Sequence, residues 1–573
     1  MTKYFSIKYV FAMAVLTVFS SVGIFAQGGS GGITGTVTDA NGAVVPNAAI
    51  TLTSNATNQS QTATTSEDGI YRFVSLQPGT YTVKSAAASF AEQSLNVEVQ
   101  VGRTTDANFT LGATNVAAEV TVTAEGVQTT QSNSDAVLSE TAISNLPING
   151  RRFQDFATLT PTAQVDPSRG QISLSGQRGI NSNINVDGVD FNQPFFGGIR
   201  GGERSNSSFT IPQEGIREFQ VVAAGYSAEF GRSTGGIVNV VTKSGSNDVR
   251  GSAFYQIRPR QLARPNAYAE ALDEQRLSTI INPVTGEVGV DATLAPTLHQ
   301  FGGSIGGPIL TDRLFYFATY EQQRFRAPRQ ILYPLLVGVT PTTTQAAVFN
   351  FYRGQEVPFT QTNDAFAGLG KIDWNINDNN RFNTRFNYSK NKALNGVSTG
   401  ETSFDPTTNR ALGTNGTEND KNWSTVNQLV SNFSASMVND LRVQYAREER
   451  PRAANELSPN VFTGIGEFGT RNFLPTTQFD TRLQFVDAVT WIAGNHTIKF
   501  GGEYSRINAE QVFGFGQTGE YSLSIGSQSA NISDTLRILS ARDATSPATF
   551  LGRFDDTRAI YRQQIGNLQA GIK

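Results

Sequence analysis

The chain has no cysteine and only two histidines, His299 and His496, and this scarcity excludes several kinds of site. Without cysteine it can form no disulfide, no thiolate zinc site and no iron–sulfur cluster. Neither histidine belongs to a metal-ligand pattern such as HExxH. We therefore expect no metal site and no cofactor, and we expect both histidines to be ordinary strand or loop residues.

Charged residues are also scarce, at 16% of the chain, where about a quarter is usual. The formal net charge of -3 gives no electrostatic basis for a nucleic-acid partner. Polarity comes instead from Asn, Thr, Ser, Gln and Gly. The 55 glycines and 38 phenylalanines favour strands and turns over helices, so the composition predicts a mainly β fold.

A long apolar run is missing beyond the first residues of the chain. Lys3 and Lys8 precede a mostly apolar stretch, Tyr9 to Val22, and the small Ala26 suits a cleavage site, although Ile24 is larger than usual there. We predict a signal peptide over residues 1–26, with a retained anchor as the alternative. No later run approaches the roughly 18 apolar residues of a membrane helix, so the chain could span a membrane only as a β-barrel.

Residues 33–112 alternate short strands with turns. The turns are DANG (Asp39 to Gly42), Asp68-Gly69 and Pro78-Gly79, and IYRFVS between the last two alternates in side-chain direction. Strands at this spacing predict a small β-sandwich.

The stretches GTVTDANGAVVPNAAITL and DGIYRFVSLQPGTYTV closely resemble the carboxypeptidase regulatory-like domain. The resemblance implies an immunoglobulin-like sandwich and no peptidase activity, and the chain departs from the family where Ser89-Phe90 replaces the frequent Gly-Phe. Such folds are sometimes assigned to carbohydrate binding, but no aromatic platform distinct from core aromatics is visible.

Residues 117–245 contain three further stretches in order. LPINGRRFQDFATLTP predicts a short helix, and ISLSGQRGINSNINVDGVDFN predicts alternating strands around Gly179 and an Asp187-Gly188 turn. The third stretch is IREFQVVAAGYSAEFGRSTGGIVNVVTKSGSN. Together they resemble the α+β plug domain of TonB-dependent receptors, in the Oar-like branch that carries a regulatory-like domain in front. We expect Gly231, Gly235 and Gly236 to permit tight turns where the plug packs inside a wall.

The segment AAEVTVTAEG precedes the plug-like stretches. By itself it is a strand or a linker. In this position it resembles a TonB box, which implies strand addition by a periplasmic energy-coupling protein. The candidate box residues are Glu119, Val120, Thr121, Val122 and Thr123.

Residues 247–573 repeat a period of two, as in RFNTRFNYS, NHTIKFGGEY, DLRVQYAR and RLQFVDAVTW. Segments of about ten residues with apolar side chains outward are typical of transmembrane β-barrels. Short turns at 377–380 and 493–496 suit the periplasmic side, and long polar stretches such as 397–422 suit extracellular loops. Trp374, Tyr388, Trp491 and Tyr504 suit an interfacial girdle.

The stretch Phe301 to Arg324 resembles an early barrel hairpin of the same Oar-like receptors. The alternation marks about ten strands, whereas the family's plugged barrel has roughly 22. The chain also ends QAGIK without a terminal aromatic strand. We therefore expect residues 247–573 to be the N-terminal part of a transmembrane barrel from a longer receptor, rather than a soluble array of β-domains.

These features predict an outer-membrane TonB-dependent receptor or transporter of a Gram-negative bacterium, which takes up an unidentified ligand with energy from the inner membrane. Its expected partners are a TonB-type coupling protein, outer-membrane lipid and an unknown extracellular ligand, with no nucleic acid. The alternative is a surface protein that binds carbohydrate or protein through the N-terminal sandwich. No nucleophile–base pair or carboxylate constellation indicates an enzyme.

Overall fold

The computed structural model describes residues 29–112, 134–165, 171–201, 209–259, 262, 296–396 and 407–523, apart from 147, 149, 337, 344, 464 and 495. The expected signal peptide, the candidate TonB box at 119–123 and the stretch 524–573 lie outside the described residues. No helix in the described part of the chain is both long and apolar enough to cross a membrane.

The N-terminal unit is a two-sheet β-sandwich, as its alternating strands predicted. One sheet has the order β4-β1-β7, with β8 also paired to β1, and the other has the order β3-β2-β5-β6. Its core is a single apolar cluster that includes Val37, Ile50, Val83 and Phe109. The strands are β1 (Gly31–Asp39), β2 (Ala49–Ser54), β3 (Ser60–Thr64), β4 (Ile70–Leu76), β5 (Gly79–Ala86), β6 (Gln93–Val99), β7 (Thr104–Asp106) and β8 (Phe109–Leu111).

The central unit, which we call the central module, is α+β with a sheet of order β13-β12-β15-β14-β9. The helix expected within 146–161 is a 3-10 helix, η1, and a short α-helix, α2, precedes it. The elements are β9 (Ser134–Leu138), α2 (Glu140–Asn145), η1 (Phe153–Leu159), β10 (Ala163–Val165), β11 (Ile172–Leu174), η2 (Gly179–Asn181), β12 (Ser182–Val186), β13 (Val189–Asp190), η3 (Gln213–Gly215), β14 (Ile216–Ala224) and β15 (Gly236–Thr242).

The third unit, which we call the wall, is an eleven-stranded sheet whose nine long strands form an antiparallel meander in chain order. The short strand β21 pairs with β18 in parallel. Among the described residues, β16 and β28 each pair on one side only. The long strands are β16 (Arg250–Arg258), β17 (Thr297–Leu310), β18 (Leu314–Ile331), β19 (Pro358–Asn377), β20 (Asn380–Leu394), β22 (Gly416–Ser434), β23 (Met437–Glu449), β27 (Thr477–Ala493) and β28 (His496–Val512); β21 (Thr407–Thr408) and β24 (Arg452–Ala454) are short. Residues 416–422, expected to be loop, are already strand.

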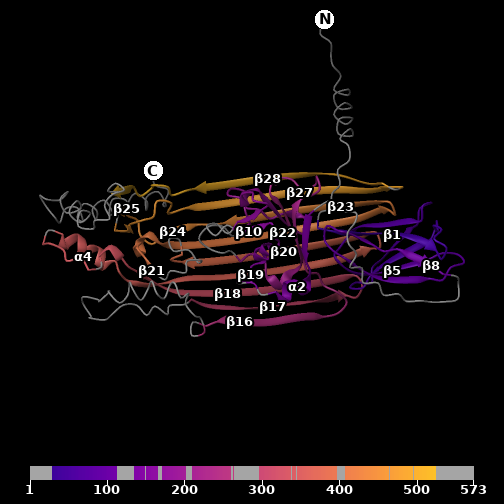
Figure 1. Cartoon of the computed structure of the whole chain (residues 1–573), viewed down its shortest axis with the longest axis horizontal. Helices are drawn as coiled ribbons and strands as arrows, with labels where there is room; N and C mark the ends of the chain where they lie inside the picture. Colours follow the sequence, from indigo (N-terminus) through magenta and orange to yellow (C-terminus); the bar gives the residue numbers. More distant parts are fainter. Residues whose placement is uncertain are drawn as a thin grey trace, which may run out of the picture.

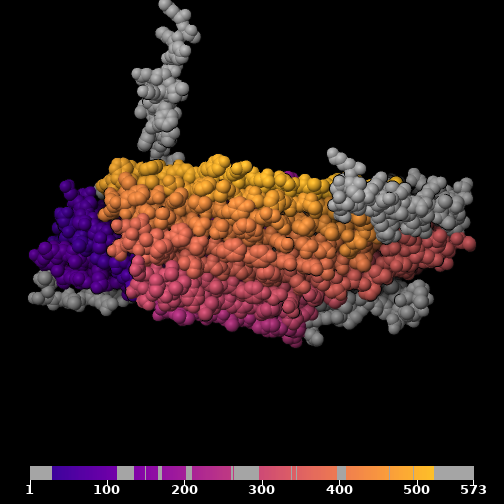
Figure 2. All heavy atoms as spheres, turned by 180° about the vertical axis from the view of Figure 1, so that it is seen from behind, coloured from indigo at the N-terminus to yellow at the C-terminus, as the bar shows by residue number. Residues whose placement is uncertain are grey.

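The three units have a clear arrangement in space. The central module lies against one face of the wall. The sandwich lies beyond one end of the wall strands (Figure 1). Seen from behind, the wall strands cover the central module, and the sandwich adjoins the wall at one end (Figure 2). The core of the central module continues into the wall, because Phe317 and Leu369 belong to the same apolar cluster as Phe219 and Val238.

The wall buries the polar half of its alternation. In β20, Asn383, Arg385 and Asn387 are buried, whereas Phe386 is 50% exposed. Trp374 and Trp491 are also exposed, close to the short turns. The inward-polar, outward-apolar pattern that the sequence predicted is therefore confirmed, and so is a barrel-like sheet.

The two ends of the wall differ. Its strands are joined by short turns at the end that holds the sandwich, whereas the far end carries α4 (Ala346–Gly354), η5 (Pro334–Leu336), β25 (Asn460–Thr463), β26 (Glu467–Phe468) and β29 (Glu520–Leu523). These long connections share a small core around Tyr333, Tyr352 and Phe468. The Tyr352 hydroxyl lies 2.7 Å from the Thr463 hydroxyl, which joins two connections that are far apart in sequence.

Candidate functional site

The residues on either side of the candidate TonB box tie the sandwich to the central module. The Arg103 guanidinium donates to both carboxylate oxygens of Asp135 at 3.1 Å, in a fork-like pair. Arg103 lies just before β7, and Asp135 lies in β9, the edge strand of the central sheet. The Arg103–Asp135 pair therefore ties the sandwich to the central module.

A second contact between the same two units involves a buried carboxylate. Glu218 of β14 accepts a hydrogen bond of 2.7 Å from the backbone N–H of Val101 in the sandwich. Burial raises the pKa of Glu218 to about 7, because neither this hydrogen bond nor the charge of Arg217 compensates fully for lost hydration. The contact therefore changes charge near neutral pH.

The Asp187-Gly188 turn, which the sequence predicted, joins the central module to the wall. Asp187 and Gly188 both have positive φ, at 52° and 74°, as a tight hairpin between β12 and β13 requires. The Asp187 carboxylate accepts from the backbone and hydroxyl of Thr242 and pairs with Arg385 of the wall at 3.0 Å. Burial opposes its ionisation, but Arg385, Lys371 and Thr242 together hold the Asp187 pKa below its ordinary value.

A buried ion pair joins the wall to the part of the central module around Asp190, Arg200 and Gly201, which we call the apex. Arg200 donates to Asp480 of β27 at 2.6 Å, and their side chains are 0% and 1% exposed. The neighbouring Gly201 N–H donates to Glu448 of β23 at 3.1 Å. Charges this deeply buried are stable only as long as they stay paired.

Asp190 forms a second buried junction. It pairs with Arg482 of β27 and with Arg232 of its own module. Its backbone N–H donates to Gln484 at 3.1 Å. The apex therefore contacts three inward-facing residues of one wall strand.

Arg151 forms a third junction, near the other edge of the wall, at β16 and β18. Its guanidinium pairs with Glu321 of β18 at 3.1 Å and with Glu214 at 3.0 Å. It also lies over the ring of Phe254 in β16, 3.9 Å from the centroid. The central module is thus held to both margins of the described sheet.

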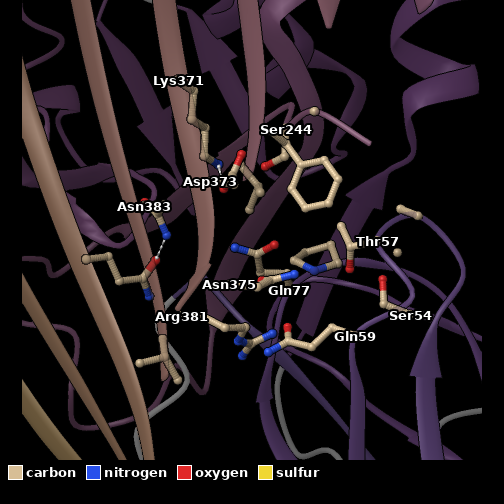
Figure 3. Close-up of a pocket in the computed structure, with 18 of the residues that line it drawn as sticks. Ser54, Thr57, Gln59, Gln77, Ser244, Lys371, Asp373, Asn375, Arg381 and Asn383 are labelled. Atoms are coloured by element: carbon tan, nitrogen blue, oxygen red, sulfur yellow. Dashed lines mark hydrogen bonds and ion pairs between the residues drawn. The ribbon is translucent and has the colours of Figure 1, made fainter. Parts of the chain in front are cut away.

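An open cavity lies where the sandwich, the central module and the wall meet. Its lining is mostly polar, with amide and hydroxyl groups beside a few charges. Figure 3 shows Gln59 and Gln77 of the sandwich facing Asn375 and Arg381 of the wall across it. Lys371 and Asp373 lie at its inner side, with the amine and carboxylate 4.0 Å apart.

The glycines of the plug-like stretch have more varied roles than the sequence suggested. Gly236, at φ 145°, packs against Leu174 and Val222 within the module rather than against the wall, and the space that a side chain of residue 231 would enter is open. The close approach to the wall is at Gly245 instead, where a Cβ would collide with the carbonyl oxygen of Tyr316.

The charged junctions were not identified from the sequence as functional residues. Asp480, Arg482 and Gln484 do occupy the polar half of the RLQFVDAVTW alternation and the residues just before it, so an inward-facing charge was visible there. Their partners Arg200 and Asp190 lie nearly 300 residues away, and no local pattern gives that pairing.

The described residues contain no group of three or more His, Asp or Glu that could hold a metal ion. Of the aromatic residues of the sandwich, Tyr71, Phe73, Tyr81 and Phe109 are buried in its core, and Phe90 is half-buried against it. Among residues 29–112, the large apolar side chain with the greatest exposure is Val44. In its described part, the sandwich therefore has no aromatic side chain that is largely exposed.

Comparison with known proteins gives matches in two parts of the chain. Residues 32–112 match the carboxypeptidase regulatory-like domain, which confirms the resemblance noted in the sequence. Residues 241–347 and 332–567 match the outer membrane beta barrel domain.

Among curated proteins, the chain is 31% identical over 308 residues to the TonB-dependent transporter Oar of Myxococcus xanthus. The match covers 52% of this chain and 27% of the relative, so the chain spans about a quarter of that protein's length.

Among solved structures, the chain is similar to the outer membrane transporter YddB from Escherichia coli, with 13% identity and a TM-score of 0.47 over 66% of this chain and 48% of that one. It is also similar to the ferric enterobactin receptor PfeA from Pseudomonas aeruginosa, with 15% identity and a TM-score of 0.44 over 66% and 50% of the two chains.

Proposed function

Because the chain belongs to the outer membrane beta barrel domain family and resides in the outer membrane, we propose that it is part of a TonB-dependent transporter. The observation that carries this proposal is the central module, which buried ion pairs hold against one face of the wall. Its relatives are transporters and receptors rather than enzymes.

In the proposed cycle, the long connections at the far end of the wall and the apex of the central module face the outside and receive the ligand. The short-turn end faces the periplasm, as short turns do in barrels of this kind. A TonB-type protein adds a strand to Glu119–Thr123. Its pull draws on the central module through β9, and the junctions at Arg200 and Asp187 separate so that the ligand can pass.

The lack of natural cysteine permits a direct test. With a mild thiol oxidant present, Val120→Cys in the full chain is expected to form a disulfide with a TonB-type protein that carries one cysteine in its pairing strand. Asn41→Cys, in an exposed sandwich turn, is the matched control. Cross-linking at Val120→Cys but not at Asn41→Cys supports the coupling, whereas equal or absent cross-linking contradicts it.

Transport itself is tested by deleting residues 116–126. Loss of uptake with ligand binding retained is the expected result, because the deletion removes coupling and leaves the outer surface intact. An unchanged uptake would favour the alternative in which the chain is a binding protein.

A further inference from the structure

We propose that the sandwich is a releasable cover over the short-turn end of the wall, and that the energy-coupled pull releases it before the central module moves. This inference rests on the proposed function and assigns the sandwich a role within it. Four kinds of observation support it: where the sandwich touches the wall, how weak those contacts are, what they cover, and where the pull is applied.

The sandwich contacts turns along the width of the wall. Asn58 donates to Asp312, in the β17–β18 turn region, at 2.9 Å. At the other margin, Arg72 donates to the carbonyl oxygen of Gly494, between β27 and β28, at 3.1 Å. A single module thus reaches from the second strand of the sheet to its last described strand.

Two further hydrogen bonds hold the sandwich, one between these margins and one beyond them, just before β16. Arg381 of β20 donates to the carbonyl oxygen of Ser75 at 3.1 Å. Asn247, just before β16, donates its backbone N–H to the carbonyl oxygen of Ala56 at 2.9 Å. These four contacts use surface groups of the sandwich, and Arg381 also interacts with Tyr81 at the margin of the sandwich core.

These contacts are much weaker than those that hold the central module. The four hydrogen bonds are solvent-exposed or half-buried, and none is an ion pair. Exposed polar contacts of this kind contribute little, since water competes for both partners. The Arg200–Asp480 pair, in contrast, is almost completely buried. When force is applied to both, the sandwich should therefore separate first.

The contacts cover the open polar cavity. Gln59 and Gln77 line it from the sandwich, while Asn375 and Asn383 line it from the wall (Figure 3). With the sandwich docked, the side-chain nitrogen of Gln59 is buried. Removal of the sandwich would open this polar space, and the inner groups Lys371 and Asp373, to the periplasm.

The point of attachment favours release by pulling. The chain leaves the sandwich after β8, a strand of three residues, and enters the central module at β9, an edge strand. The Arg103–Asp135 pair joins the two exits. A pull on the chain between β8 and β9 therefore applies force to the sandwich and the central module at once. The partly exposed Arg103–Asp135 pair bears this force before the core of either unit.

The test measures exposure of the covered surface in cells whose outer membrane has been made permeable to the label while the inner membrane stays intact. Gln59→Cys, in the otherwise cysteine-free full chain, is labelled with a polyethylene glycol maleimide too bulky for the cavity. Labelling is compared between energised cells and cells treated with a protonophore. Asn41→Cys, on an exposed turn, is the control that should label equally in both.

We expect labelling of Gln59→Cys to rise on the order of tenfold in energised cells and to stay low when residues 116–126 are deleted. A second substitution, Asn58→Gly, removes the amide that reaches Asp312 and suits the positive φ of 55° at that position. It should raise labelling without energy, and unchanged labelling there would count against these contacts as the hold on the sandwich.

Parallel cross-linking at Val120→Cys separates the two ways in which the inference could fail. If Val120→Cys cross-links to the coupling protein while Gln59→Cys stays protected, the sandwich is a fixed mount and the inference is wrong, although the proposed function stands. If neither reacts, the proposed function is wrong and the inference falls with it.

Discussion

The sandwich and the wall are built from the same alternating strands, but they bury opposite halves of the alternation. In the sandwich, Ile50 and Leu52 are buried, whereas Thr51 between them and Thr53 after them face outward. In β20 of the wall, Asn387 and Ser389 are buried and Phe386 is exposed. A period of two predicts a strand in both regions. Whether the apolar or the polar residues are buried depends on the surroundings of each face of the sheet.

The interior of the wall therefore has to solve a problem that the sandwich does not have. An apolar core needs no partners, whereas each buried charge must be paired or hydrated. The wall meets this demand with residues of the central module, as at Arg200–Asp480 and Arg385–Asp187. The two units thus depend on each other, while the sandwich has a core of its own.

The largest expected effect comes from placing a charge in the apolar core of the sandwich. Val83→Asp places a charge in the sandwich core, where Val83 is 0% exposed, and should cost about 5 kcal/mol. We expect selective unfolding of the sandwich, detected as rapid proteolysis within residues 29–112 of the full chain. Lys84→Asp, at the exposed neighbouring position, is the control, and equal protease resistance of the two variants would contradict the prediction.

The next largest effect comes from breaking a buried ion pair between the central module and the wall. Asp480→Ala leaves Arg200 charged and unpaired in the interior, which should destabilise the packing of the central module by about 3–5 kcal/mol. Denaturant-dependent proteolysis of the central module measures this cost. Arg200→Met combined with Asp480→Leu should recover most of it, and a double variant no better than the single one would argue against a charge-pairing role.

A third prediction tests the medium outside the wall. Phe386→Arg should cost about 2–4 kcal/mol if that face contacts lipid, but less than about 0.5 kcal/mol if it contacts water. Urea unfolding of the chain in lipid vesicles distinguishes the two. Phe386→Leu keeps the side chain apolar and serves as the reference.

The smallest effect concerns the junction between the sandwich and the central module. Because burial raises the folded-state pKa of Glu218 to about 7, the folded chain holds this proton more tightly than the unfolded chain. The resulting stability is present at acidic pH and is lost as pH rises to 7, by about 2 kcal/mol between pH 5 and pH 7.

Glu218→Gln should remove this part of the pH dependence, since an amide can still accept from Val101 but cannot ionise. The measurement is the denaturation midpoint of both chains at several pH values between 5 and 8. Parallel pH profiles for the two chains would mean that Glu218 does not titrate in this range.

The residues that were predictable from the sequence are those whose pattern is local. The Asp187-Gly188 turn, the sandwich strands around Tyr71 and the inward and outward faces of β20 all follow from neighbours in the chain. The helix α2 was missed, because six residues, ETAISN, give too short a pattern for a helical period to emerge. The candidate box at 119–123 stays a prediction.

Sequence alone determined the kind of strand, the turns and the family resemblance, because these depend on residues within about ten positions of each other. Only the tertiary structure decided the partners of the charges and the position of the sandwich. Arg200 meets Asp480, and Asn58 meets Asp312, across hundreds of intervening residues. Such pairings depend on the register of every strand between them, and that register is fixed by the packing of the whole sheet rather than by any one segment.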